Sequence, residues 1–336
     1  MVIPINSYQF GVEIEITGIT RYKAFRIVCS ELDLQSTSAH KSDMGYEVRD
    51  NDNRLWKVVC DNSIRTERKK DICIVSAPME YAVEVVTPVL TYYADIDKLT
   101  RIAAALKKAG ALVNGTTGIH VHVGAKRFNS RTLINILNLF AGKQELLYAA
   151  LVVFPKRMRY CRKIDNDLIS RLNKAQPRTM EQFSEEYYKG FGGKTINQYN
   201  RYSRSRYYGL NCHSLCTTKT LEFRLYNSAL HSDVIRTYIL LSIAMVNYAL
   251  NQNEIAPCSE CEVSQKALED WLQEIGFIGP EYTTPIKLLK SSIIQDEKIR
   301  FVSERGFADF STFDNDNHTV YIPSSILCDA FEEEIY

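Results

Sequence analysis

Gly118-Ile119-His120-Val121-His122-Val123-Gly124 is the most informative stretch of this chain. Its apolar residues alternate with two histidines, which is the pattern of a β-strand with one face toward a core. In such a strand, His120 and His122 project from the opposite face and both imidazoles face one cleft. The stretch therefore predicts a sheet with one apolar face and one functional polar face.

Three further stretches repeat this alternation with mostly acidic polar residues. Their polar residues are Glu13 and Glu15 in the first, Glu84 in the second, and Glu222, Arg224 and Tyr226 in the third. A single outward Glu is usually a solvated side chain, and a lone His is usually scaffolding. Four strands that each place acid or imidazole opposite an apolar face are different, because a plain two-sided sheet would carry mixed Thr, Ser and Lys there.

The carboxylates on this face require a cation. Glu13 and Glu15 would lie about 7 Å apart on one side of their strand, and at an effective dielectric of about 20 they would repel by roughly 2 kcal/mol. If the four strands share a sheet, Arg224 alone cannot neutralise their carboxylates. Oxygen-rich ligation with an occasional imidazole suits Mg²⁺ or Mn²⁺, whereas a structural zinc site needs cysteines or more histidines.

The composition indicates a globular protein with almost no net charge. The chain has 336 residues, 45% of them hydrophobic, and a net charge of +1, which excludes a general polyanion binder. Nine cysteines without a regular framework fit reduced thiols, and residues 1–10 lack a signal-peptide pattern, so we predict a cytoplasmic protein. Residues 234–250 are the most apolar stretch, but polar residues interrupt them and they are too short for a membrane span. We predict a buried helix there and no membrane contact.

Other segments show ordinary helix, strand and turn signals. Helices are predicted over residues 21–32, from Asp95 as N-cap to an end at Gly110, and from Ser130 as N-cap toward Val153. A strand over residues 56–60 runs into Asp61-Asn62-Ser63, which is turn chemistry.

Five motifs follow one another in an informative order. They are Phe10-Gly11-Val12-Glu13-Ile14-Glu15, Glu84-Val85-Val86-Thr87-Pro88, Gly118-Ile119-His120-Val121-His122, Leu210-Asn211 and Thr220-Leu221-Glu222-Phe223-Arg224. Over about residues 8–250 this order closely resembles the putative amidoligase family, which are carboxylate-amine ligases with the catalytic fold of glutamine synthetase and glutamate-cysteine ligase. The resemblance implies an α+β fold in which an antiparallel sheet has helices on one face and the active site on the other.

The resemblance also implies a reaction and a set of roles. The polar face would bind two or three divalent ions around the phosphates of ATP, a substrate carboxylate would form an acyl phosphate, and an amine would displace phosphate to leave an amide. The metal ligands would be Glu13 with His120 and Glu222, and Glu15 with Glu84; His122 would contact the nucleotide phosphates, and Arg224 would brace the transferred phosphoryl group. The predicted catalytic residues are Arg224, Asp61 and Glu84.

Several of these roles have alternatives. The Glu84 metal should have a second carboxylate, which could be Glu80 or Asp61. By the resemblance Asp61 lines a substrate pocket and could deprotonate an attacking ammonium, or it could simply form an Asx turn. The possible phosphate or carboxylate clamps before the last strand are Arg201, Arg206 and Asn211, and we expect a role for only one of the two arginines.

Two segments differ from the rest in charge. Residues 155–206 contain thirteen Lys or Arg and five acids, with interleaved aromatic residues, whereas residues 251–336 are acidic. We predict a catalytic domain over residues 1–250 with residues 155–206 as a basic insertion, and an acidic extension over residues 251–336 that packs on it. The insertion could be a solvated face, bind nucleic acid or an acidic or polyphosphorylated ligand, or cover the active site and help hold ATP.

The sequence thus predicts an ATP-dependent carboxylate-amine ligase that uses Mg²⁺ or Mn²⁺. Its acid and amine substrates could be an amino acid, a peptide, a protein side chain or a cell-wall component. Two alternatives stay open. One is a metal-dependent hydrolase that uses the His-x-His strand and activates water. The other is a non-catalytic protein that binds an acidic partner. Nucleic acid as the bound partner is less favoured.

Overall fold

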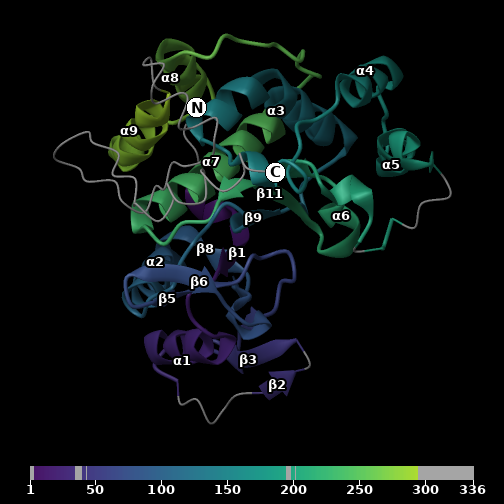
Figure 1. Cartoon of the computed structure of the whole chain (residues 1–336). Coiled ribbons are helices and arrows are strands. Elements are labelled where there is room, and N and C mark those ends of the chain that lie inside the picture. Colours follow the sequence, from purple (N-terminus) through teal and green to yellow (C-terminus); the bar gives the residue numbers. More distant parts are fainter. Residues whose placement is uncertain (1–3, 35–39, 43, 194–197, 201, 294–336) are drawn as a thin grey trace, which may run out of the picture.

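A nine-stranded sheet forms the centre of the computed structural model, which describes residues 4–34, 40–42, 44–193, 198–200 and 202–293 (Figure 1). The spatial order is β10 (Leu210–Asn211), β11 (Thr220–Asn227), β9 (Gly118–Gly124), β1 (Gln9–Ile16), β7 (Val83–Val86), β4 (Leu55–Val59), β3 (Gly45–Arg49) and β2 (His40–Ser42). β8 (Leu90–Thr91) pairs with the first residues of β1. All of these pairs are antiparallel. A separate hairpin consists of β5 (Glu67–Lys70) and β6 (Cys73–Ser76).

The apolar face of the sheet carries the core. α1 (Arg21–Glu31) packs on β3, β4 and β7, α7 (Ser232–Leu250) packs on β9, and α2 (Tyr92–Lys108) packs against both helices. The alternating apolar residues of β1 and β9 are at most 1% exposed, as the strand pattern predicted. They are Val12, Ile14, Ile16, Ile119, Val121 and Val123. The prediction of an α+β fold on an antiparallel sheet is confirmed, and its glutamine-synthetase-like topology stays a prediction.

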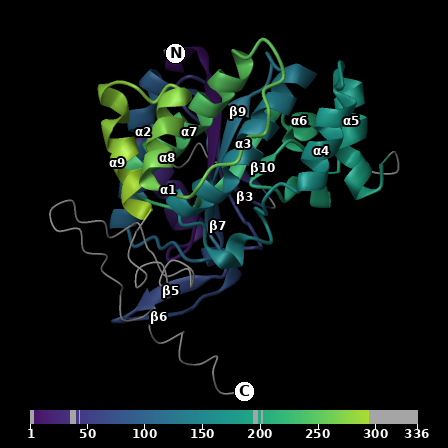
Figure 2. The ribbon, with the colours of Figure 1, turned by 90° about the horizontal axis from the view of Figure 1, so that it is seen from above.

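The remaining helices lie on α7 or at the β10 end of the sheet. α3 (Ser130–Ala150) packs on α7, and α9 (Thr283–Ser292) packs on both, next to α8 (Gln265–Glu274). α4 (Asn166–Ala175) and α5 (Met180–Tyr188) pack together, and α6 (Ser214–Thr217) contacts β11. Seen from above, strands lie between α1, α2 and α7 on one side and α4, α5 and α6 on the other (Figure 2).

Two helices begin at other caps than the sequence predicted. α2 begins at Tyr92, with Thr91 as the N-cap residue, so the prediction of Asp95 as N-cap was wrong. Asp95 lies one turn inside, where its carboxylate accepts a hydrogen bond from the Thr91 backbone N–H at 2.9 Å. α3 is capped by Asn129, whose side-chain oxygen accepts a hydrogen bond from the Thr132 N–H, and Ser130 is its first residue.

Helix α7 confirms the prediction of a buried apolar helix. Among the described residues it is the one helix long and apolar enough to cross a membrane, and 78% of its most apolar window is buried inside the protein. It is therefore a core helix that supports the sheet. The cytoplasmic location stays a prediction.

A β-bulge in β11 changes the face of one predicted polar residue. Phe223 pairs with Val121 and Tyr226 with Ile119, so β11 uses one more residue than β9 over this interval. Tyr226 therefore lies on the apolar face, where its hydroxyl is 2.8 Å from Ser242 Oγ of α7. The prediction that Tyr226 shares the polar face with Glu222 and Arg224 was wrong, because strict alternation ignores the extra residue.

Candidate metal centre

The polar face gathers its acidic and imidazole side chains on four neighbouring strands, β7, β1, β9 and β11. Residues that pair directly across antiparallel strands point to the same face. The pairs on this face are Glu13 with His120, Glu15 with Glu84, and Glu222 with His122. The strand register alone therefore brings together six of the predicted site residues.

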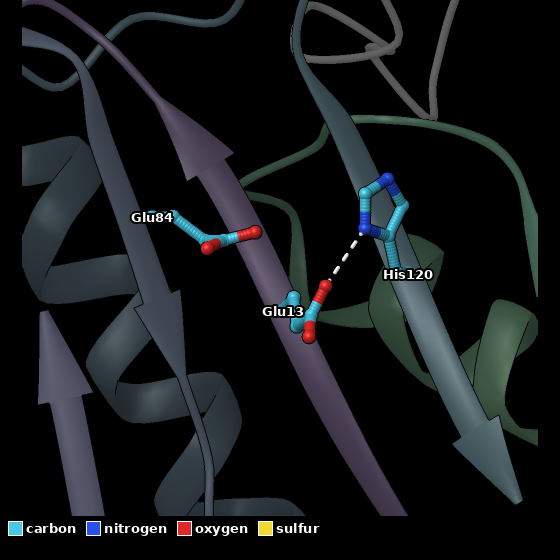
Figure 3. A group of neighbouring side chains, drawn as sticks. All are labelled: Glu13, Glu84 and His120. Carbon is cyan, nitrogen blue, oxygen red and sulfur yellow. Dashed lines mark hydrogen bonds and ion pairs between the residues drawn. The ribbon is translucent and has the colours of Figure 1, made fainter. Parts of the chain in front are cut away.

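Glu13 lies at the middle of the cluster. Its Oε2 is 2.9 Å from His120 Nδ1 and its Oε1 is 3.4 Å from His122 Nε2. Figure 3 shows Glu13 on β1 between Glu84 of β7 and His120 of β9. The side chain of Glu13 is 26% exposed, whereas those of His120, Glu15 and Glu222 are at most 5% exposed. Glu13 is therefore more open to a ligand than His120, Glu15 and Glu222.

Three groups of side chains within the cluster could each hold a metal ion. In each group the ligand atoms lie within 4.8 Å of one another. The groups are Glu13, Glu84 and His120; Glu13, His122 and Glu222; and Glu15, Asp61 and Glu84. No group has more than one imidazole, and the other donors are carboxylate oxygens. This donor set fits Mg²⁺ or Mn²⁺ better than a structural zinc ion.

The electrostatics of the cluster favour a bound cation. Burial, together with the charges of Glu13, Glu15 and Asp61, holds the pKa of Glu84 well above its usual range. Burial also raises the pKa of Glu15. Such shifts mean that these carboxylates cannot all be charged at low cost without a partner, and a divalent cation would supply that partner.

Glu222 is held by two neighbours. Arg224 Nη1 donates a charged hydrogen bond to Glu222 Oε1, and Asn211 Nδ2 donates to Glu222 Oε2 at 2.6 Å. Although burial acts in the other direction, Arg224 and His122 hold the pKa of Glu222 below its usual value. Asn211, predicted to bind the cofactor, thus lies where it orients a carboxylate of the cluster.

His122 has the setting of a metal ligand as much as that of a phosphate contact. Its Nδ1 is 2.8 Å from Thr220 Oγ1, and its buried Nε2, 3.4 Å from Glu13 Oε1, forms no hydrogen bond with any described residue. Metal-ligating histidines usually engage their other ring nitrogen in this way, which fixes the ring. The geometry groups His122 with Glu222, and His120 with Glu84. The assignment of metal to His120 and phosphate to His122 stays a prediction.

Asp61, and not Glu80, lies beside the predicted second metal position. Asp61 joins Glu15 and Glu84 in one ligand group, whereas Glu80 is an exposed residue. One oxygen of Asp61, Oδ1, accepts the Ser63 N–H at 2.7 Å, so the Asx turn is present as well. The turn holds the carboxylate at the end of β4, next to the polar face.

Comparison with known proteins agrees with the order of motifs. The family described as "Putative amidoligase enzyme" matches residues 6–246. The chain belongs to the putative amidoligase family. None of the curated proteins compared with the chain matches it. The family match ends within α7, so α8 and α9 lie outside it.

The protein has a buried arginine beside the cluster that the sequence did not reveal. Arg157, in the 3₁₀ helix η4 (Pro155–Arg157), is 2% exposed. Its guanidinium donates to the carbonyl oxygens of Arg224 at 2.8 Å and of Leu225 at 3.1 Å, and also to that of Tyr226. These are the carbonyls of the β11 bulge. Arg157 therefore holds the backbone that carries Arg224.

Gly118 makes room for this guanidinium. A Cβ at position 118 would lie far inside van der Waals contact with Arg157 Nη2. The backbone N–H of Gly118 also donates to Glu15 Oε2 at 2.6 Å. Nothing in the sequence distinguished Arg157 from the other basic residues of its segment, because a buried arginine and a solvated one look alike there.

The two remaining predicted clamps, Arg201 and Arg206, belong to the segment before β10. Arg206 is in the 3₁₀ helix η7 (Arg204–Arg206), with its guanidinium carbon 5.6 Å from the centroid of the Tyr207 ring. Arg201 lies outside the described residues.

Proposed function

We propose that this amidoligase joins a carboxylate to an amine with consumption of ATP and with Mg²⁺ or Mn²⁺ as cofactor. The observation that carries the proposal is the set of three adjoining ligand groups on one face of the sheet, which share Glu13 and Glu84. One ion would be held by Glu13, His122 and Glu222, and another by Glu15, Asp61 and Glu84. When bound, the ions would neutralise the phosphates of ATP, a requirement of phosphoryl transfer.

Arg224 is the group we assign to the transferred phosphoryl. It is 5% exposed, and Glu222 and the Tyr160 carbonyl, 3.4 Å from its Nε, hold its guanidinium in place. A planar guanidinium suits two-point contact with phosphoryl oxygens. A fixed cation of this kind stabilises charge as it develops and does not have to reorganise.

The proposed reaction has two steps. An oxygen of the substrate carboxylate attacks the γ-phosphorus, the bond to ADP breaks, and an acyl phosphate forms. The amine nitrogen then attacks the acyl carbon, the carbon–oxygen bond to phosphate breaks, and phosphate leaves. The amine must lose a proton, and Asp61 is the carboxylate beside the cluster that we propose to accept it or to position the amine. The two roles proposed for Asp61, ligand of the ion at Glu15 and Glu84 and acceptor of the amine proton, are alternatives.

The chemistry of the cluster favours this reaction over metal-dependent hydrolysis. A hydrolase with a His-x-His strand would usually present a further imidazole at the position of Glu222 or Arg224. Carboxylates around a phosphoryl-binding arginine fit phosphoryl transfer better.

A test incubates the protein with ATP, Mg²⁺ and a panel of carboxylic acids, with hydroxylamine as the amine. An acyl phosphate would be trapped as a hydroxamate, which is detected by mass spectrometry, and phosphate release would depend on one acid. Activity without ATP, or ATP turnover that no acid stimulates and no hydroxamate accompanies, would contradict the proposal.

A further inference from the structure

A polar cleft lies outside the metal centre, beside α4 and the 3₁₀ helix η5 (Lys189–Phe191). It encloses about 540 Å³ and is lined by Arg162, Arg171, Arg204, Phe191 and Tyr208, among others. Cavities that hold small-molecule ligands typically measure about 300–1,000 Å³. None of the residues that line the cleft belongs to the three ligand groups of the metal centre. The cleft is therefore a second place where a ligand could bind.

Arg162 is fixed in the wall of this cleft. Its guanidinium carbon is 4.3 Å from the centroid of the Tyr208 ring and 5.5 Å from that of Phe191. Its backbone N–H donates to the Tyr207 carbonyl at 3.0 Å, and its carbonyl accepts from the Gly209 N–H at 2.8 Å. Two aromatic rings position the cation, but its buried Nε has no hydrogen-bond partner in the described part of the chain.

Arg171 of α4 also lines the cleft. Its guanidinium packs over Gly190, where an added Cβ would be 3.0 Å from Arg171 Nη2. Its Nε is also buried and has no hydrogen-bond partner among the described residues. A buried donor without an acceptor is costly, so two such donors in one cleft fit a ligand that supplies acceptors.

The acids of the cleft do not neutralise these arginines. Within the described parts of the chain, Arg162, Arg171 and Arg204 form no ion pair with Asp165, Asp167 or any other carboxylate. Asp165 accepts a hydrogen bond from the Tyr208 hydroxyl. Asp167 lies in the first turn of α4, where the helix dipole favours an acidic side chain.

We propose that the cleft binds the phosphate or carboxylate group of an anionic small molecule, at a site separate from the metal centre. Arg162 and Arg171 would provide fixed guanidinium donors inside the cleft. Arg204, which is exposed, would close over the anion from the outer end. Arginine is suited to this task because its planar fork contacts two oxygens of phosphate or carboxylate at once. The site does not depend on the proposed ligase activity.

Calorimetric titration of the metal-free protein with inorganic pyrophosphate and, separately, with citrate tests the site. We expect the wild type to bind at least one probe at millimolar concentration or below. Arg171→Gln and Arg204→Glu should each weaken that binding at least tenfold. Arg178→Gln, which removes an exposed arginine outside the cleft, should leave it within about twofold. Preference for pyrophosphate would identify a phosphate ligand, and preference for citrate a carboxylate ligand.

Three results would overturn the proposal. The wild type could fail to bind either probe, or Arg178→Gln could lose as much probe binding as the cleft variants. Alternatively, Arg171→Gln could lose binding of a Mg²⁺·ATP analogue in parallel, which would assign the cleft to the nucleotide site. Arg204 is exposed, so the Arg204→Glu protein should keep the wild-type circular dichroism and melting temperature, which makes a loss of binding interpretable.

Discussion

Glu13 belongs to two of the three ligand groups, one of which contains His120 and the other His122. Glu13→Gln should therefore lower Mn²⁺ affinity and ATP turnover by more than about 100-fold. Even residues that only orient metal ligands contribute about 10- to 100-fold. Mn²⁺ titration and phosphate release would measure the two effects.

The matched control for this change is Glu80→Gln. It removes the same charge from an exposed residue outside the ligand groups, so Mn²⁺ affinity and turnover should stay within about twofold of wild type. Full activity of Glu13→Gln, in a protein that keeps its circular dichroism, would contradict the metal assignment.

Thr220 tests whether His122 is a metal ligand. Its hydroxyl lies 2.8 Å from His122 Nδ1 and fixes the ring. Thr220→Val should lower Mn²⁺ affinity about 10- to 100-fold, and Thr220→Ser, which keeps the hydroxyl, should restore most of it. If Thr220→Val changes ATP affinity but not metal affinity, His122 contacts the nucleotide instead.

The side chains of the polar face could be predicted from the sequence because each one alternates with apolar neighbours. Glu13, Glu15, Glu84, His120, His122 and Glu222 were all found in this way. Asp61 follows a strand as part of a turn. The alternation of apolar and polar residues therefore could not decide whether Asp61 or Glu80 is the second carboxylate beside Glu84. Arg157 carried no signal, since its partners are backbone carbonyls 67 to 69 residues away.

At the scale of single elements, β9 and the bulge of β11 depend on one close contact. Gly118→Ala would force the Arg157 guanidinium away from the carbonyls of the bulge. We expect a loss of about 2–4 kcal/mol in the free energy of unfolding, from overpacking and from buried carbonyls left without donors. Urea unfolding followed by circular dichroism would measure it.

The other end of the same strand offers the control. A Cβ at Gly124 would meet its nearest atom, the Gln9 carbonyl oxygen, at 3.5 Å, which is ordinary contact. Gly124→Ala should change the free energy of unfolding by less than about 1 kcal/mol. Equal effects of the two substitutions would mean that Arg157 does not support the bulge.

The elements themselves were more predictable than their details. The helices that became α1 and α7, and the strands that became β1, β4 and β9, lay where their periodicity placed them. The β11 bulge could not be predicted, because an extra residue leaves no mark in an alternating sequence. Tyr226 was therefore assigned to the wrong face.

At the scale of the whole molecule, the part of the chain beyond the family match packs closely on α3. Gly142 lies within α3, where a Cβ would be 2.6 Å from the Ser259 carbonyl oxygen. Ala is normally better than Gly inside a helix by about 1 kcal/mol. Here we expect Gly142→Ala to lower the free energy of unfolding by about 1–3 kcal/mol, because the segment around Ser259 would be displaced. A higher melting temperature of Gly142→Ala would show that the contact between Gly142 and Ser259 is not tight.

The order of the strands in the sheet could not be predicted from the sequence. Alternation indicated that four strands share a polar face, but not that β1 lies between β7 and β9. That order arises from long crossovers, which local patterns do not encode. The packing of α9 on α3 could not be predicted either, since it joins segments more than 100 residues apart.

The sharing of Glu13 and Glu84 between ligand groups has a thermodynamic consequence. An ion held by Glu13, Glu84 and His120 would use one carboxylate of each of the other two groups, so its binding could not be independent of theirs, and the effect would be reciprocal. The first ion bound would relieve the repulsion among the carboxylates and would also take up part of the negative charge that attracts the next. Metal loading of this sheet would therefore be a linked equilibrium, in which affinity depends on what is already bound.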